Sequence, residues 1–165
     1  RRVGVCKGHS GAVTHIDWSE DGTFLQSTDS NFGLSFWNLS TQVQKPVPEF
    51  RQQLKGILES NRKWATFTST YGWPVRGIYR PGFEGIGVNS CDRSPSRSML
   101  LTAEDSGLVR LYPYPASFGV LVKSNPGHAA PVQSVRFSAS ATYAVSVGGR
   151  DLTILQWRVS EADIR

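Results

Sequence analysis

The sequence has 165 residues, of which 39% are hydrophobic and 19% charged, and this composition is typical of a folded domain. It excludes a disordered chain, a collagen-like fibre and a disulfide scaffold, since the only cysteines are Cys6 and Cys91. No run approaches the ~20 consecutive apolar residues that cross a membrane, so we expect an intracellular protein without a membrane partner. The chain begins at Arg1 rather than at a methionine, and we expect it to be a piece of a longer protein.

Basic residues are concentrated in the middle of the chain. Residues 41–98 hold nine basic and four acidic side chains, a net charge of +5, whereas the segments before and after carry −1 and +1. A concentrated positive field accelerates encounter with acidic partners. A basic surface without a partner is the alternative interpretation. The candidate partner-binding residues in this segment are Lys55, Arg62, Lys63, Arg76 and Arg80.

The first predicted elements are three short strands, at 13–19, 24–27 and 34–37, which follow Gly8-His9. Turn residues separate them, with Asp21-Gly22 before the second strand and Asn31-Phe32-Gly33 before the third. Residues 49–60 come next and carry apolar side chains at helical spacing. They predict a short amphipathic helix inside the basic segment.

This pattern of strands and turns returns twice, and such internal repeats determine the fold. A degenerate copy has strands at 88–91, 99–102 and 108–112 and lacks the Gly-His pair. The last copy is closer to the first, because Gly127-His128 precedes strands at 132–137, 143–146 and 154–157.

The segment 93–98 is expected to be the loop between the first two strands of the middle copy. It places Ser94 before Pro95 and between two arginines. We therefore consider Ser94 as a hypothetical phosphorylation site, because phosphorylation there would subtract charge from the basic segment.

A Gly-His, three short strands and an aromatic residue ending the third strand resemble a blade of the WD-repeat β-propeller. In that family a His before the blade, a Ser or Thr on the second strand, an Asp in the next turn and a Trp on the third strand form a hydrogen-bonded tetrad. The resemblance implies one structural tetrad of His9, Ser27, Asn31 and Trp37, with Asn31 in place of the Asp. It implies another of His128, Ser146, Asp151 and Trp157. In the middle copy only Thr102, Ser106 and Tyr112 match, so the tetrad is incomplete.

The predicted fold class is therefore all-β: a propeller fragment of about three four-stranded antiparallel blades. It is not a closed ring by itself, because a propeller closes with about 4–8 blades. The expected division is a blade at 1–48, a basic insertion and inter-blade segment with a strand at 49–85, a degenerate blade at 86–124, and a blade without its outer strand at 125–165.

The run Trp64-Ala65-Thr66-Phe67-Thr68, with the stretch after it to Tyr79, resembles the second propeller of the echinoderm microtubule-associated protein-like family. The resemblance implies a cytoplasmic, non-catalytic scaffold of the microtubule cytoskeleton, as in spindles, cilia or axonemes. Its implied partners are tubulin or microtubules, directly or indirectly, and other cytoskeletal proteins. The alternative is a generic WD-repeat adaptor in a multi-subunit complex of the ciliary transport or ubiquitin ligase type.

Other site chemistry is not supported by the sequence. It contains no phosphate-binding loop, His-Glu-x-x-His or Cys-x-x-Cys motif, so we predict no enzyme and no cofactor. Cys6 and His9 lack the two further ligands of a closed zinc site, so we predict no metal. Aromatic residues among the basic ones could stack on nucleic-acid bases, but their strand-like runs favour core packing and disfavour a nucleic-acid partner.

Overall fold

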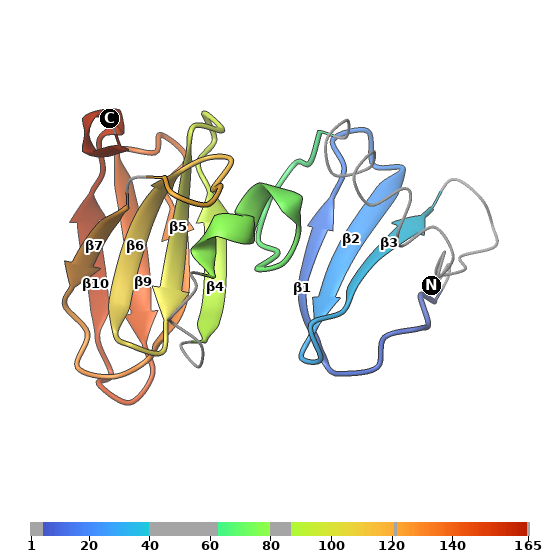
Figure 1. The fold of residues 1–165 in the computed structure, drawn as a ribbon, viewed down its shortest axis with the longest axis horizontal. Coiled ribbons are helices and arrows are strands. Elements are labelled where there is room, and N and C mark those ends of the chain that lie inside the picture. Colours follow the sequence, from blue (N-terminus) through green and yellow to red (C-terminus); the bar gives the residue numbers. More distant parts are fainter. Residues whose placement is uncertain (1–4, 40–62, 80–86, 121, 165) are drawn as a thin grey trace. The chain divides into compact units, whose positions relative to one another are not determined.

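A computed structural model describes residues 5–39, 63–79, 87–120 and 122–164. The chain divides into two compact units, residues 1–73 and 74–165. The described regular structure is a set of antiparallel strands and two short 3-10 helices (Figure 1). Neither helix is long or apolar enough to cross a membrane.

The first unit is built on one sheet. Its strands β1 (Val13–Trp18), β2 (Phe24–Asp29) and β3 (Leu34–Asn38) are ordered as they follow in the chain, with antiparallel pairing throughout. The segment after residue 62 runs beside β1, where the Ala65 N–H donates to the Trp18 carbonyl at 2.8 Å. Within this segment Trp64 is buried, and its ring lies 6.0 Å from that of Phe36 on β3. The segment thus completes a small apolar core.

The second unit holds two sheets. The four-stranded sheet consists of β4 (Val88–Arg93), β5 (Met99–Glu104), β6 (Leu108–Pro113) and β7 (Lys123–Pro126), in that order. The three-stranded sheet consists of β8 (Val132–Phe137), β9 (Tyr143–Gly148) and β10 (Ile154–Arg158), with β9 in the centre. The helix η2 (Trp73–Ile78) precedes β4, and η3 (Glu161–Ile164) follows β10.

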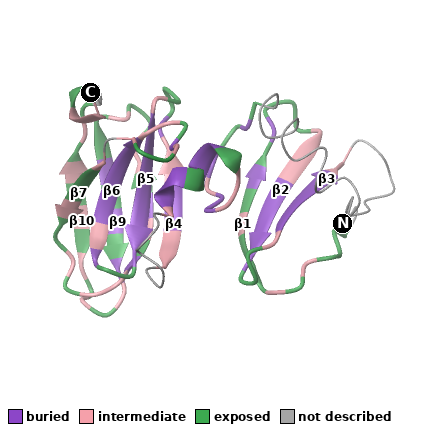
Figure 2. Cartoon of the chain, in the orientation of Figure 1, coloured by how far each residue is buried: buried purple, intermediate pink, exposed green. Residues whose placement is uncertain are grey.

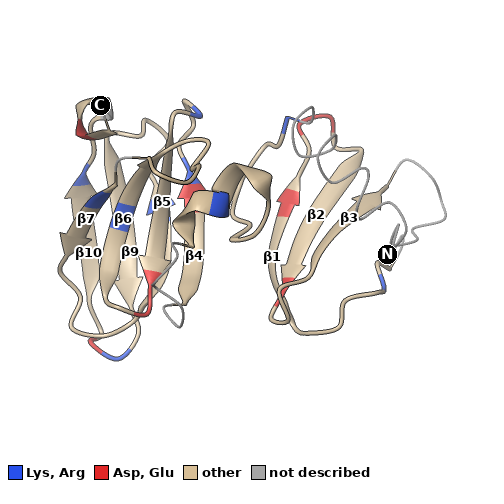
Figure 3. Ribbon diagram, viewed as in Figure 1, with Lys and Arg blue, Asp and Glu red and all other residues tan. Residues whose placement is uncertain are grey.

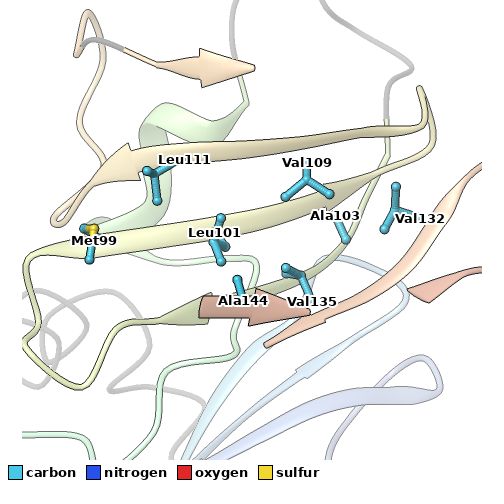
Figure 4. Close-up of a cluster of buried hydrophobic side chains, with 8 residues drawn as sticks. All are labelled: Met99, Leu101, Ala103, Val109, Leu111, Val132, Val135 and Ala144. Carbon is cyan, nitrogen blue, oxygen red and sulfur yellow. The ribbon is translucent and has the colours of Figure 1, made fainter. Parts of the chain in front are cut away.

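The core of the second unit lies between its two sheets (Figure 4). Met99 and Leu101 on β5 and Leu111 on β6 pack against Val135 on β8 and Ala144 on β9, and each is at most 3% exposed. All six residues of β5 are buried (Figure 2), whereas burial alternates along β9. Alternation is expected of a strand with one covered face. The three-stranded sheet β8–β10, the third sheet in chain order, is therefore covered only on the side of the four-stranded sheet β4–β7, the second sheet.

Two sheet faces expose apolar side chains. On β1 these are Val13, Ile16 and Trp18, exposed by 54%, 56% and 47%. On the outer face of the third sheet they are Val145 and Ile154, which are 40% and 72% exposed. Repeat units depend on neighbours to bury such faces. We therefore expect both faces to need a further sheet for full stability.

Each sheet uses the same serine-closed turn between its first two strands. In the first sheet the Ser19 hydroxyl accepts the Phe24 N–H at 2.9 Å, while the Ser19 N–H donates to the Phe24 carbonyl at 2.9 Å. Ser94 and Ser138 make the corresponding pairs in the other sheets. The residue three places after each serine has a positive φ, and these residues are Gly22, Arg97 and Ala141.

The predicted all-β architecture is confirmed, and the middle copy has the full set of four strands. In the described residues the first and last copies have three strands each. The strand β7 ends at Pro126, so it crosses the boundary proposed at residue 124. The described part of the segment 49–85 has an isolated bridge between Ser19 and Trp64 and the helix η2, and the strand proposed in this segment stays a prediction. The helix predicted at 49–60 lies outside the described residues.

The turn at Gly22 provides a test of backbone conformation alone. Its φ is +67°, and a methyl group added there would meet nothing within 4 Å. We expect Gly22→Ala to destabilise the protein by about 1 kcal/mol, because a left-handed backbone is unfavourable for a residue with a Cβ. The measurement is the urea unfolding midpoint. Gly22→Asn should cost less, since Asn tolerates this conformation, and equal effects of the two variants would contradict this account.

Candidate functional site

A chain of hydrogen bonds ties the loop before β1 to the first sheet. The indole Nε1 of Trp37 donates to the Ser27 hydroxyl oxygen at 2.7 Å, and this hydroxyl lies 2.6 Å from Nε2 of His9. On the other side of the imidazole ring, Nδ1 lies 2.7 Å from a carboxylate oxygen of Asp29. Three elements, β2, β3 and the preceding loop, are joined in this way.

The third sheet repeats the cluster. Trp157 Nε1 donates to the Ser146 hydroxyl at 2.8 Å, and this hydroxyl lies 2.7 Å from Nε2 of His128. The Nδ1 atom of His128 lies 2.8 Å from the Asp151 carboxylate. The structure thus brings together the four residues proposed for this repeat from the sequence.

The order of donors in the first cluster follows from the indole, which can only donate. The hydroxyl of Ser27 accepts that proton and directs its own to Nε2 of His9, so Nδ1 carries the proton shared with Asp29. A serine, a histidine and an aspartate in line resemble a nucleophilic triad. However, the Ser27 side chain is buried and its oxygen is already occupied by Trp37. This geometry satisfies buried polar groups and leaves no room for attack on a substrate.

The first cluster corrects one residue of the sequence interpretation. The carboxylate comes from Asp29, at the end of β2, and not from the turn position of Asn31. The Asn31 side chain instead donates to the Ser10 carbonyl at 3.0 Å. Asp29 stands two residues after Ser27, whereas Asp151 stands five residues after Ser146, so the two copies place the acid at different positions.

Glycine marks the opposite side of each turn. A Cβ on Gly33 would overlap the carboxylate of Asp29, and a Cβ on Gly148 would overlap that of Asp151. The carboxylate thus comes from a strand residue in the first sheet and from a turn residue in the third. In each sheet a glycine leaves space for the carboxylate. An aspartate and a glycine near the turn after the second strand were therefore the sequence feature that both copies share.

The second sheet replaces the tetrad with a different buried cluster. Glu104, which is 1% exposed, accepts hydrogen bonds from the hydroxyls of Thr102 at 3.4 Å and Ser106 at 3.1 Å. A guanidinium nitrogen of Arg110 lies 3.4 Å from the same carboxylate. A buried acid paired with a base avoids the cost of an isolated buried charge. Sequence reasoning missed both Glu104 and Arg110, because it searched for the family's Asp.

A further carboxylate anchors the segment after residue 62 to the first sheet. Asp17 on β1 is 1% exposed and accepts the Thr66 hydroxyl at 2.8 Å. It also accepts the backbone N–H groups of Thr68 at 2.8 Å and Ser69 at 3.1 Å, and the Gln26 side chain at 2.9 Å. In the sequence, Asp17 lies between the apolar residues Ile16 and Trp18 of a predicted strand, and this pattern could have indicated a buried acid.

Only two of the five proposed partner-binding residues lie in the described part of the chain. Lys63 and Arg76 are both exposed. Arg76 lies in the last turn of η2, the helix with a blue segment in Figure 3. Lys55, Arg62 and Arg80 lie outside the described residues.

The phosphorylation hypothesis for Ser94 does not fit the structure. Ser94 is 0% exposed, and its hydroxyl accepts the Met99 N–H at 3.0 Å to close the turn between β4 and β5. A kinase has no access to this oxygen in the folded sheet. The proline and arginines around Ser94 indicated an open loop, but the serine itself is the buried residue of that loop.

Over residues 1–159 the sequence matches the family described as "Echinoderm microtubule-associated protein second beta-propeller". The chain belongs to this family. It is 38% identical over 159 residues to the 77 kDa echinoderm microtubule-associated protein of Strongylocentrotus purpuratus, with 96% of this chain and 22% of that protein covered. It is 37% identical over 160 residues to the human Echinoderm microtubule-associated protein-like 3, with 96% and 17% covered.

One of the similar proteins is named as ciliary. The "Ciliary WD repeat-containing protein ctxp80" of Euplotoides octocarinatus is 34% identical, with 95% of this chain and 21% of that protein covered. The chain thus spans about a fifth of the length of these curated relatives. A chain in the crystal structure of the mitotic checkpoint complex superimposes with a TM-score of 0.62 at 15% identity, covering 96% of this chain and 52% of that one. This last likeness supports the fold alone.

The tetrad of the third sheet can be tested at its central hydroxyl. We expect Ser146→Ala to destabilise the protein by about 1–3 kcal/mol, since the indole of Trp157 and the imidazole of His128 would both lose a partner. Denaturant unfolding measures this loss. Ser140→Ala, in an exposed turn, is the matched control and should change stability by less than about 0.5 kcal/mol. A harmless Ser146→Ala would show that the hydroxyl is dispensable.

The tetrad of the first sheet makes stability depend on acid pH. The hydrogen bond from His9, aided by the N–H groups of Gly33, Asn31 and Ser10, lowers the pKa of Asp29 from 3.8 to about 2 despite burial. A lowered pKa stabilises the folded state above the ordinary value of 3.8, and this contribution is lost as the pH falls toward 2.

We therefore expect the unfolding free energy of the wild type to fall between pH 4 and about 2 more steeply than that of Asp29→Asn. Urea unfolding across this pH range measures the two slopes. Parallel slopes for the two proteins would mean that Asp29 is not the responsible group.

Proposed function

We propose that this propeller segment is part of a non-catalytic scaffold of the microtubule cytoskeleton and that it binds tubulin or other cytoskeletal proteins. The observation that supports the proposal is the match to the second propeller of the family over residues 1–159. Relatives named as microtubule-associated and ciliary match nearly all of the chain. The expected location is therefore the microtubules of spindles or cilia.

The geometry of the tetrads supports binding rather than catalysis. Both tetrad serines are buried and bonded to an indole, so neither can serve as a nucleophile. The remaining buried acids, Asp17 and Glu104, are engaged in hydrogen bonds that hold the sheets. In the described part of the chain these buried polar groups thus stabilise the fold, and partners would bind at the surface.

The charge of the middle segment supports an acidic partner. Residues 41–98 carry a net charge of +5, and the described members Lys63 and Arg76 are exposed. The acidic surface of tubulin is complementary to such a segment, and complementary charge raises association rates. Contact of this kind weakens as salt screens it.

Co-sedimentation of the full protein with microtubules across a salt series tests the proposal. We expect Lys63→Glu and Arg76→Glu, with or without reversal of Lys55, Arg62 and Arg80, to weaken binding about tenfold or more. Arg150→Glu is the matched control, because Arg150 is exposed in a turn of the third sheet and lies outside the basic segment.

The other outcomes of this experiment are equally informative. A microtubule affinity that changes neither with salt nor with charge reversal would place the tubulin contact outside this segment. No binding at all would reject the microtubule proposal in favour of a generic WD-repeat adaptor.

A further inference from the structure

The third sheet has one uncovered face, and the strand register defines its residues. Cross-strand partners in an antiparallel sheet lie on the same side, and Val145 on β9 is paired with Arg136 on β8 and with Gln156 on β10. We name this side of the sheet the outer face. It contains no acid, and its residues are Ser134, Arg136, Tyr143, Val145, Val147, Ile154, Gln156 and Arg158.

The corresponding face of the second sheet is already covered by a sheet. Met99 on β5 corresponds to Tyr143 on β9, because each lies five residues after the serine that closes the preceding turn. The β5 face that carries Met99 and Leu101 packs against the third sheet, and both side chains are 2% exposed (Figure 4). The outer face is the same face of the next sheet, yet its β9 side chains are 39–40% exposed. A further sheet is therefore the expected cover.

The turn before the third strand of each sheet has one position at which a later segment comes close. In the first sheet this position is Phe32, whose ring centre lies 5.4 Å from that of Tyr71. In the second it is Gly107, where a Cβ would come within 2.7 Å of the His128 carbonyl oxygen. In the third it is Leu152, which is 90% exposed at a left-handed φ of 55°. A leucine gains nothing for the fold in such a place, and a covering segment would bury it.

An arginine replaces the carboxylate that holds the covering segment on the other two sheets. Asp17 on β1 and Asp92 on β4 accept backbone N–H groups of a later segment. Arg136 occupies the same position of β8, the fifth residue of the strand. A guanidinium can only donate hydrogen bonds. A segment that covers the third sheet must therefore offer an acceptor where the other segments offer an N–H.

Both arginines of the outer face have donors left for such an acceptor. The Arg158 side chain is exposed, and its guanidinium makes no hydrogen bond or ion pair with the described residues. Arg136 Nη1 donates to the carbonyls of Cys91 at 3.2 Å and Val135 at 3.1 Å, while its side chain is 51% exposed. Its Nε and Nη2 groups make no hydrogen bond within the described ranges. A carboxylate binds a guanidinium more strongly than a neutral acceptor does.

We propose that the outer face docks a further β-sheet of the same polypeptide, outside residues 1–165, which places aspartate or glutamate side chains on Arg136 and Arg158. Apolar side chains of that sheet cover Val145 and Ile154. The curated relatives are about five times as long as this chain, so such a sheet has room in a protein of their length. The first sheet of a second copy fits less well, because the one acid of β1, Asp17, is buried and engaged. This docking needs no microtubule partner and is tested separately from the proposed function.

Zero-length cross-linking of the full protein tests the docking. Arg136→Lys and Arg158→Lys keep the charge, and each supplies an amine that a carbodiimide couples to a carboxylate in contact with it. We expect mass spectrometry to find both amines linked to Asp or Glu of the same molecule outside residues 1–165. Lys123 and Asp163, which form an ion pair at 2.6 Å, are the positive control. Ser140→Lys, in an exposed turn, is the negative control.

Three cross-linking results would overturn the proposal. They are no link at either arginine position while the Lys123–Asp163 link forms, links to residues 1–165 of a second copy, and links to a different protein. Thermal unfolding of the full protein gives an independent measure. We expect Arg158→Glu to lower the midpoint by about 2–4 °C and Ser140→Glu to leave it unchanged. An unchanged midpoint in Arg158→Glu would also reject the docking, and circular dichroism establishes that each variant is folded.

Discussion

Satisfaction of buried polar groups is the constraint on which the blades depend. A tryptophan that fills the space between strands brings an indole N–H into the interior, and that proton needs an acceptor. In the first and third sheets a serine hydroxyl accepts the indole N–H. The same hydroxyl is hydrogen-bonded to a histidine, and the other nitrogen of that imidazole is hydrogen-bonded to an aspartate. Because the histidine precedes its sheet by several residues, the same relay fixes the path of the chain into the blade.

Carboxylates on the first strand of a blade have a second use, which is to hold a later segment of the chain. Asp17 on β1 and Asp92 on β4 occupy corresponding positions, four residues after Val13 and Val88. Asp17 accepts N–H groups of Thr68 and Ser69, and Asp92 accepts the N–H of Phe137 on β8. A charge-assisted hydrogen bond to a backbone donor is among the stronger contacts available to a carboxylate. Each acid thus pins that later segment to its own sheet.

Burial separates the polar side chains that hold the sheets from the residues at the surface. In the part of the chain that the structure describes, the tetrad serines are buried in hydrogen-bonded clusters, while the exposed apolar faces on β1, β9 and β10 suit further sheets. Arginines of η2 and β4 lie over aromatic rings of the loop after β6. Loops carried on a rigid scaffold are the usual place for recognition.

The sequence by itself determined the all-β repeat, the strands and the turns, because strand alternation and turn chemistry are local. Its resemblance to the WD-repeat family implied eight tetrad residues, and the structure brings seven of them together as implied. Only the tertiary structure placed Asp29 instead of Asn31, buried Ser94, and joined Asp17 to Thr66 and its neighbours. Those contacts depend on which backbone groups come within hydrogen-bonding distance once the sheets have formed. For Asp17 that distance is set by packing between segments about 50 residues apart, and periodicity along the chain does not encode it.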